Sequence, residues 1–206
     1  MGTDMSIRVI IADDETILRD ALEAILSLQA DIDVIAVASD GVEAVAQIAH
    51  HQPDVAVLDL QMPGLDGIDV TEKAAELSPR TRCMILTSHA RPGYLKRALT
   101  AGARSFLPKT TSARGLADVI RKVHDGQRYV DPELSAEAIA AGDSPLTPRE
   151  ADVLELAAEG APVEEIAQRA HLSVGTVRNY LSSAAIKLDA PNRHVAAERA
   201  KEKGWI

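Results

Sequence analysis

Five short aliphatic runs, separated by longer segments with helical spacing of apolar residues, constrain the fold of this chain more than any other feature. The runs are IRVIIA (7–12), DVIAVA (33–38), DVAVLD (54–59), RCMILT (82–87) and SFLP (105–108). Strand-length runs that alternate with helix-length segments are typical of βα units, whose right-handed crossovers place helices on the faces of a parallel sheet. The sequence therefore predicts a five-stranded, doubly wound parallel α/β domain.

A different pattern, without any strand signal, begins at residue 145. Thr147 and Glu150 form a capping box around Pro148, which predicts a helix start, and a second helix is expected over about 162–170. Ser173 then caps a third helix, whose inward-facing positions recur at steps of three or four: Val177, Leu181, Ala184 and Leu188. This pattern predicts a small all-α helix-turn-helix domain.

The two patterns divide the chain into an α/β domain over 1–127 and a helical domain over 145–206. Residues 128–144 contain Pro132 and Gly142 around a short alanine-rich segment, and we expect them to form a linker. The length of 206 residues fits two small domains better than one large one. Because aromatic residues make up only 2% of the chain, Val, Ile, Leu and Ala must fill both cores.

The apolar segments and the single cysteine indicate the cellular compartment of the protein. Cys83 excludes a disulfide framework and a cysteine zinc cluster, and its place in RCMILT predicts a buried thiol. No apolar stretch approaches membrane-spanning length, and the N-terminus lacks the order of a secretion signal. We therefore expect a cytoplasmic protein with no membrane partner.

The net charge of −9 argues against a nucleic-acid partner if the chain is taken as a whole. The charge of its separate segments does not. Residues 1–127 hold 13 basic and 18 acidic side chains, which gives −5, whereas residues 173–206 hold 6 basic and 3 acidic side chains, which gives +3. The sign reverses in the segment where a nucleic-acid surface would be needed.

Charged and polar side chains follow four of the expected strands. Asp13 and Asp14 follow the first strand, Asp59 ends the third, and Thr87 and Lys109 close the last two. In the flavodoxin-like strand order, ligands gather at the carboxyl ends of strands one and three. Clustered carboxylates favour a hard divalent cation such as Mg²⁺, and one of them can act as a nucleophile toward phosphorus. We expect Asp59 to be that nucleophile, with Thr87 and Lys109 compensating the phosphoryl charge.

Each of these residues has an ordinary structural explanation. An Asp-Asp pair before a helix often serves only as a cap and first-turn acid, and a single strand-terminal Asp, Thr or Lys is commonly solvated. The phosphate-acceptor interpretation depends on their conjunction, because several separate segments each end in the residue type that this chemistry requires.

Taken together, these motifs carry a resemblance to a known family. Residues 7–125 resemble the receiver domain of two-component response regulators, through IIADDE, VLDLQMPGLDG, ILTSH and FLPKT in this order. Residues 145–206 resemble the LuxR-type helix-turn-helix, through LTPRE, the EIA of the second helix and LSVGTVRNYL. The whole chain thus resembles the NarL/LuxR-type response regulators.

The resemblance implies a set of roles for the residues of the first domain. Asp59 would accept a phosphoryl group from a sensor histidine kinase, and Asp13 and Asp14 would bind Mg²⁺ together with Asp59 and the backbone carbonyl of Gln61. Thr87 would contact the phosphoryl group and Lys109 would pair with it. Phe106 occupies the position of the family's switch aromatic, although an aromatic residue in a strand is ordinarily part of the core.

The resemblance also implies that the third helix of the second domain enters the major groove of double-stranded DNA. It identifies Thr176, Arg178, Asn179 and Lys187 as DNA-facing, with Arg178 and Lys187 suited to phosphates and Asn179 to a base edge. These residues would otherwise form a solvated helix face. Ile186 should point outward near the end of this helix, where the family dimerises, so we expect it in a subunit contact.

The second helix departs from the family pattern. It begins Ala161-Pro162-Val163-Glu164, where the family commonly has a Ser cap followed by polar or basic residues. We therefore expect poorer phosphate contacts there and modest DNA affinity without dimerisation.

The sequence leads to a transcription regulator, and not an enzyme, in which phosphorylation promotes a homodimer that binds DNA. Masking of the third helix by the unphosphorylated receiver is an alternative to dimerisation as the switch. A phosphohydrolase is disfavoured because Gln61 stands where such hydrolases place a second acid. A regulator that ignores phosphate is disfavoured by the intact acidic set.

Overall fold

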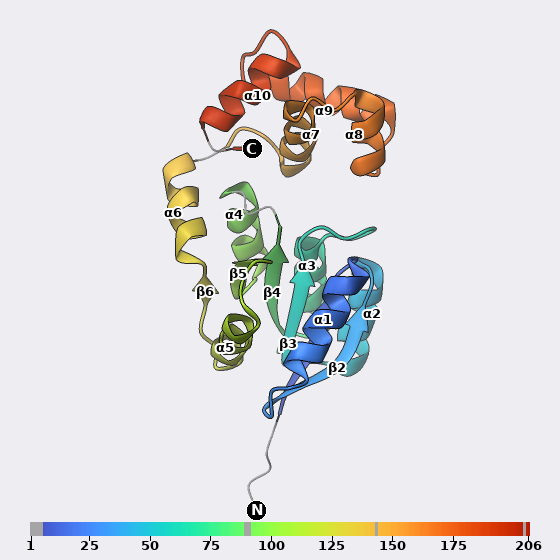
Figure 1. Cartoon of the computed structure of the whole chain (residues 1–206), viewed down its shortest axis with the longest axis vertical. Helices are drawn as coiled ribbons and strands as arrows, with labels where there is room; N and C mark the ends of the chain where they lie inside the picture. The colour runs from blue at the N-terminus through green and yellow to red at the C-terminus, as the bar shows by residue number, and fades with distance from the viewer. Residues whose placement is uncertain (1–5, 89–91, 143, 204) are drawn as a thin grey trace, which may run out of the picture. The chain divides into compact units, whose positions relative to one another are not determined.

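The computed structural model describes residues 6–88, 92–142, 144–203 and 205–206. Its strands are β1 (Ile7–Ala12), β2 (Ile32–Ala38), β3 (Val55–Asp59), β4 (Arg82–Thr87), β5 (Ser105–Pro108) and β6 (Tyr129–Val130). The helices of the first part of the chain are α1 (Thr16–Leu26), α2 (Gly41–His51), α3 (Gly67–Leu77), α4 (Pro92–Ala101) and α5 (Ala113–His124). They are followed by α6 (Pro132–Ala141), α7 (Pro148–Ala158), α8 (Val163–Arg169), α9 (Val174–Lys187) and α10 (Arg193–Glu202) (Figure 1).

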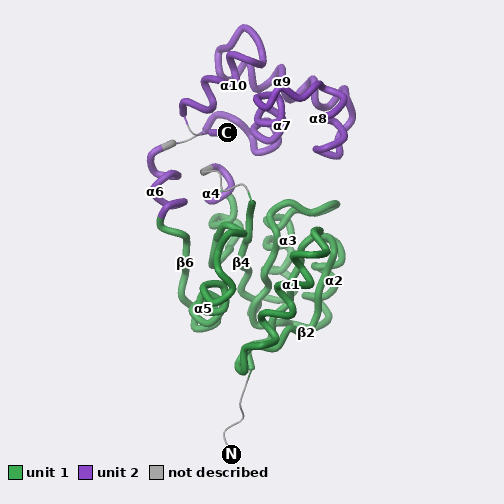
Figure 2. The backbone as a smooth tube through the Cα atoms, in the orientation of Figure 1, with its two compact units in different colours: residues 1–90, 96–132 green, residues 91–95, 133–206 purple. Residues whose placement is uncertain are grey.

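The chain forms two compact units, coloured separately in Figure 2. The first contains residues 1–90 and 96–132, and the second contains residues 91–95 and 133–206. The short strand β6 and helix α6 both lie within the segment that was expected to be a linker. The domain limits at 127 and 144 stay a prediction. None of the described helices combines the length and the apolar character needed to cross a membrane.

The first unit contains a parallel sheet with the strand order β2-β1-β3-β4-β5-β6. The predicted parallel α/β class is confirmed, with the flavodoxin-like order over the first five strands. The sixth strand was not expected, because its two residues pair with Ser105 and Phe106 of β5 without any aliphatic run of their own. Strand order reverses between β1 and β3, so the carboxyl ends of these two strands lie at the switch point.

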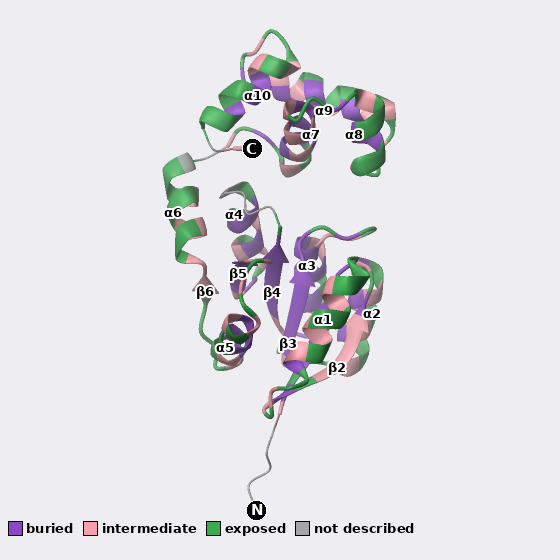
Figure 3. Cartoon of the chain, viewed as in Figure 1, coloured by how far each residue is buried: buried purple, intermediate pink, exposed green. Residues whose placement is uncertain are grey.

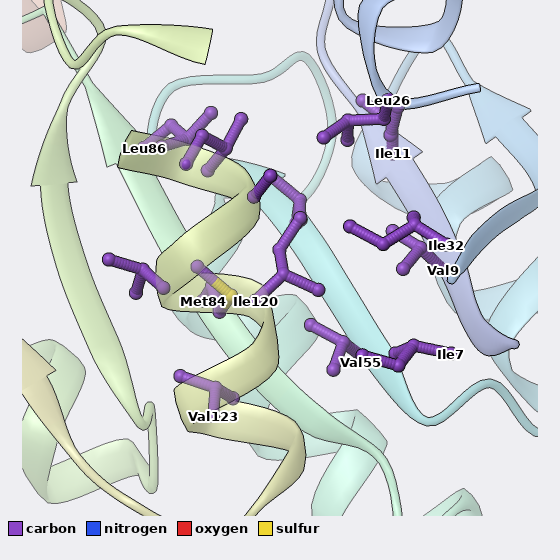
Figure 4. Close-up of a cluster of buried hydrophobic side chains, with 14 of the residues drawn as sticks. Ile7, Val9, Ile11, Leu26, Ile32, Val55, Met84, Leu86, Ile120 and Val123 are labelled. Carbon is purple, nitrogen blue, oxygen red and sulfur yellow. The ribbon is translucent and has the colours of Figure 1, made fainter. Parts of the chain in front are cut away.

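Buried aliphatic residues fill the space between one face of the sheet and helices α1 and α5 (Figure 4). Leu26 of α1 and Ile120 and Val123 of α5 pack against strand residues that include Val9 and Met84. The central strand β3 is buried along its whole length, which agrees with its continuous apolar sequence (Figure 3). This rigid sheet fixes the positions of the polar residues at its carboxyl edge.

The second unit has its own core, formed by helices α7 to α10. The predicted helix starts are confirmed, because Thr147 and Glu150 form a reciprocal capping box and the Ser173 side chain accepts a hydrogen bond from the Thr176 N–H. Three of the four residues expected to face inward from the third helix, Val177, Leu181 and Ala184, are buried within α9, and the fourth, Leu188, is buried at its C-cap. The helix-turn-helix arrangement follows from these caps and from the apolar spacing.

Candidate phosphate-acceptor site and helix-turn-helix face

The three carboxylates predicted to bind a metal come together at the carboxyl edge of the sheet. One oxygen from each of Asp13, Asp14 and Asp59 lies within 4.8 Å of the other two. Asp13 and Asp59 are buried, at 1% and 5% exposure, whereas Asp14 is exposed. The parallel sheet explains this convergence, since β1 and β3 are hydrogen-bonded neighbours and end side by side.

Lys109, just beyond β5, supplies the positive charge of this site. Its Nζ lies 3.0 Å from Asp13 Oδ2, 3.2 Å from Asp59 Oδ1 and 2.8 Å from Glu15 Oε1. Burial alone lowers the pKa of Lys109, but the hydrogen bond to Glu15 and the charges of Asp59 and Asp13 outweigh it and raise the pKa above its ordinary value. The lysine is therefore a permanent cation shared by three carboxylates.

The buried position of Asp59 disfavours its charged form. Burial raises its pKa to about 7, against the attraction of Lys109, and the charge of Asp13 raises it further. One oxygen of Asp13 accepts the Glu15 N–H at 2.9 Å. Its other oxygen accepts no hydrogen bond from any described residue, and the Lys109 ammonium alone compensates it. Buried, under-compensated carboxylate oxygens of this kind suit Mg²⁺, a hard cation that prefers oxygen ligands.

The other residues predicted for this site lie close by in the fold. Thr87 ends β4 and is buried, and its carbonyl accepts the Lys109 N–H at 2.8 Å. Gln61 lies two residues after Asp59 in the turn beyond β3 and is exposed. Phe106 is fully buried in β5, opposite Ile85 of β4, two residues before Thr87. Its burial fits a core role, and the switch role stays a prediction.

Two residues that contribute to the site were not identified from the sequence. Glu15, which precedes α1 without capping it, binds the Lys109 ammonium instead. Gly67, at the start of α3, lies so close to the backbone of Asp59 that an added Cβ would be 2.3 Å from the Asp59 carbonyl oxygen. The D-G pair where α3 begins is a sequence signal for such a close approach, whereas nothing in the sequence pairs Glu15 with Lys109.

The residues predicted to face DNA lie along α9 in the second unit. Arg178 and Asn179 are exposed, and Thr176 is half-buried in the first turn, where its hydroxyl lies 2.8 Å from Ser173 Oγ. The Arg178 guanidinium lies 3.8 Å from the Glu164 carboxylate of α8. Glu164, in the first turn of α8, thus pairs with Arg178, one of the two residues predicted to contact a DNA phosphate.

Lys187, at the end of α9, makes a contact that was not expected. Its Nζ lies 2.7 Å from Glu150 Oε2, and the Ser183 hydroxyl donates to Glu150 Oε1 at 2.5 Å. Burial alone raises the pKa of Glu150, but the hydrogen bonds from Lys187, Ser183 and Thr147 outweigh it and lower the pKa to about 2. Lys187 therefore links α9 to the start of α7, and its predicted contact with DNA would compete with this link. Ile186, the predicted dimer residue, is 80% exposed.

Comparisons with known proteins place both units in described families. Residues 9–121 match the response regulator receiver domain, and residues 144–200 match the bacterial regulatory proteins of the luxR family. The chain is 41% identical over 200 residues to the transcriptional regulatory protein DesR of Bacillus subtilis (strain 168), covering 97% of this chain and 99% of DesR. It is 33% identical over 208 residues to the response regulator protein VraR of Staphylococcus aureus, covering 98% of this chain and 100% of VraR.

Solved structures show the same relationship. A complex of the two-component response regulator RcsB with DNA matches with a TM-score of 0.61 and 26% identity, covering 95% of this chain and 98% of that one. The receiver domain of NarL from Mycobacterium tuberculosis matches with a TM-score of 0.58 and 32% identity, covering 60% of this chain and 99% of that one. The acidic cluster, the capped helix-turn-helix and these matches together show that the chain belongs to the NarL/LuxR-type family of two-component response regulators, transcription regulators with a receiver and a LuxR-type DNA-binding domain.

Proposed function

We propose that Asp59 is the phosphoacceptor of this response regulator and that a sensor histidine kinase is the donor. The observation that carries the proposal is the convergence of three carboxylates within 4.8 Å, with the Lys109 ammonium 3.2 Å from Asp59. An ionised Asp59 oxygen attacks the phosphorus of a phosphohistidine, so that a P–O bond forms while the P–N bond breaks and the imidazole takes up a proton. The product is an aspartyl phosphate at the end of β3.

Each neighbouring side chain has a distinct role in this transfer. Asp13, Asp14, Asp59 and the backbone carbonyl of Gln61 would hold Mg²⁺, which supplies positive charge to the transferring phosphoryl oxygens when bound. The Lys109 ammonium pairs with a phosphoryl oxygen, and the Thr87 hydroxyl donates a hydrogen bond to another. A nearby cation also favours the ionised form of Asp59, whose pKa burial raises to about 7.

We infer that phosphorylation acts on transcription by promoting a homodimer that binds double-stranded DNA in the cytoplasm. A receiver dimer raises the effective concentration of the second helix-turn-helix at its half-site. A shift of Thr87 toward the phosphoryl group would be followed by Phe106 on the neighbouring strand, which changes the packed surface of the receiver. Ile186, exposed on α9, is proposed to contact the second subunit on DNA.

The proposed DNA contacts divide into phosphate and base contacts. Arg178 and Lys187 would each neutralise a phosphate, and Asn179 would hydrogen-bond to a base edge, with Thr176 near the backbone. Arg178→Gln should weaken binding to all sequences and reduce the salt dependence by about one counterion, whereas Asn179→Ala should relax sequence preference. The paired acid at Glu164 explains why we expect modest affinity from a single module.

The deciding experiment treats the full-length protein with acetyl phosphate and Mg²⁺ and measures its mass and oligomeric state beside Asp59→Asn. The proposal predicts one added phosphoryl group and a shift toward dimer in the wild type, and neither in Asp59→Asn. Phosphorylation that persists in the variant would refute the assignment of Asp59. Removal of residues 1–144 separates the two switching modes, since DNA binding rises if masking dominates and falls if dimerisation dominates.

A further inference from the structure

A hollow of about 630 Å³ opens in the first unit, at the edge of the sheet where the strands begin. Its lining includes Arg82 at the start of β4, Arg80 in the turn before it, and Arg104 just before β5. Thr87, at the other end of β4, belongs to the phosphate-acceptor site. The two ends of this strand are five residue steps apart, which corresponds to about 16 Å, so the hollow is separate from that site.

The charge of this hollow is unusual for the unit that contains it. Three arginines and one carboxylate, Asp54, line it, whereas residues 1–127 together have an excess of acidic side chains. The guanidinium groups of Arg80, Arg82 and Arg104 form no hydrogen bond or ion pair with any residue that the structure describes. Asp54 already accepts the backbone N–H of Arg8 at 2.9 Å. The hollow thus contains three cationic groups that the fold itself does not use.

Some other arginines of the same unit are paired within the fold. The Arg8 guanidinium binds the carbonyls of His51 and Gln52, and the Arg121 guanidinium binds the Asp31 carboxylate at 2.7 Å. Arg114 and Arg128 also make no side-chain contact with a described residue, but they are exposed and lie outside the hollow. What distinguishes Arg80, Arg82 and Arg104 is that all three line one hollow, which favours an external partner there. That partner has to be an anion.

The remaining lining leaves space and adds no competing charge. Ala75 of α3 and Ala101 of α4 contribute small side chains, and Gly102 has open space where a Cβ would stand. The Thr71 hydroxyl donates to the Gly67 carbonyl, and burial raises the pKa of the Cys83 thiol to about 12, so this part of the lining is neutral at physiological pH. The arginines therefore determine which ligands the hollow attracts.

We propose that this hollow binds a small anion with two or more linked phosphate groups, such as pyrophosphate or the phosphate chain of a nucleotide. The fork of a guanidinium group matches two phosphate oxygens, and one compact oligophosphate can reach three such forks together. The volume lies within the range of small-molecule sites, roughly 300–1,000 Å³. An extended acidic peptide fits less well, because its charges are spread along a chain that a hollow of this size does not enclose.

The test titrates inorganic pyrophosphate, and separately ATP, into the full-length protein by calorimetry in the presence of EDTA. EDTA removes divalent cations, so a metal at Asp59 plays no part and failure of this proposal leaves the proposed function intact. We expect a Kd below about 1 mM for pyrophosphate. Similar affinities for the two ligands would assign recognition to the phosphate chain, and tighter binding of ATP would add a contact with the nucleoside.

Three variants decide whether the hollow is the binding site. Arg82→Gln/Arg104→Gln should weaken binding at least about tenfold, and Ala75→Leu should weaken it similarly by filling the space without a change of charge. The control Arg114→Gln/Arg128→Gln removes the same charge from exposed positions outside the hollow and should bind as the wild type does.

Several outcomes would overturn the proposal. These are no binding of pyrophosphate at millimolar concentrations, an equal loss in the control variant, or unchanged binding in Ala75→Leu. Binding of a polyglutamate peptide without binding of pyrophosphate would assign the hollow to an acidic protein segment instead. If the double arginine variant fails to fold by circular dichroism, Ala75→Leu alone decides, since its position on α3 is exposed.

Discussion

Replacement of Glu150 by Gln should destabilise the helix-turn-helix unit in a way that depends on pH. Glu150 is 4% exposed and is held by the Lys187 ammonium at 2.7 Å, by the Ser183 hydroxyl and by the Thr147 N–H. The variant keeps the shape of the side chain but removes the negative charge that Lys187, Ser183 and Thr147 stabilise. It leaves the Lys187 ammonium without its carboxylate.

The magnitude follows from the pKa shift. A carboxyl group whose pKa falls from 4.5 to about 2 on folding contributes at most about 3 kcal/mol to the free energy of unfolding at neutral pH. About a third of the Lys187 side chain is exposed, and solvent screening there reduces the attraction. We therefore expect Glu150→Gln to lower the free energy of unfolding by about 1 to 2 kcal/mol at pH 7.

The sign of the pH dependence follows because the folded-state pKa is depressed. The contribution of the charged carboxylate is fully present above the unfolded pKa of 4.5 and is lost as the pH falls toward the folded pKa of about 2. The difference in stability between wild type and Glu150→Gln should therefore be constant from pH 7 down to about 5 and should shrink below that.

The assay uses the single tryptophan of the chain as a reporter. Trp205 packs against the core of the second unit, so urea unfolding followed by tryptophan fluorescence reports on that unit in the full-length protein. Lys187→Met should cost a similar amount, and the double variant should cost less than the sum of the two single variants. Equal stability of wild type and Glu150→Gln at pH 7, or a difference that does not shrink in acid, would refute the reasoning.

Three further predictions concern the two functional faces. Glu164→Gln removes the acid 3.8 Å from Arg178, so DNA affinity in a binding titration should rise a few-fold at low salt, with the gain fading at high salt. Gly67→Ala places a Cβ against the Asp59 carbonyl oxygen, so the free energy of unfolding should fall by about 1–3 kcal/mol. Acetyl phosphate should also label this variant more slowly than the wild type. Unchanged labelling would contradict the packing argument. Saturating Mg²⁺ should stabilise the first unit against urea by about 3 kcal/mol at 100 times its Kd, and Asp13→Asn should abolish most of that gain, as circular dichroism can show.

The sequence predicted most of the fold because its local signals agree with its tertiary contacts. Three strands, IRVIIA, RCMILT and SFLP, have the predicted limits, since each is an apolar run that the sheet buries. Strand β6 escaped prediction because Tyr129 and Val130 are only half-buried and join the sheet through pairing with β5. A two-residue strand that forms by pairing with the edge of a sheet is too short to show a periodic pattern of apolar residues.

The convergence of the acidic side chains was predictable for a related reason. Parallel strands bring their carboxyl ends to one edge, so Asp13 and Asp59 needed only the correct strand order to meet. The partners of the lysines were not predictable. Lys109 binds Glu15 across 94 positions of sequence and Lys187 binds Glu150 across 37, and such long-range pairs depend on packing distances that a linear pattern does not encode.

The pairing of β6 with β5 determines where the chain leaves the receiver. Tyr129 N–H donates to the Arg104 carbonyl and Asp131 N–H donates to the Phe106 carbonyl, so the last receiver segment is fastened to the strand that carries Phe106. Helix α6 begins at the following residue, Pro132. A displacement of the Phe106 backbone would therefore move Asp131 and the main-chain segment that leads from β6 into α6. Phosphorylation of Asp59, as proposed above, would then act through the main chain itself on the segment that leads into α6.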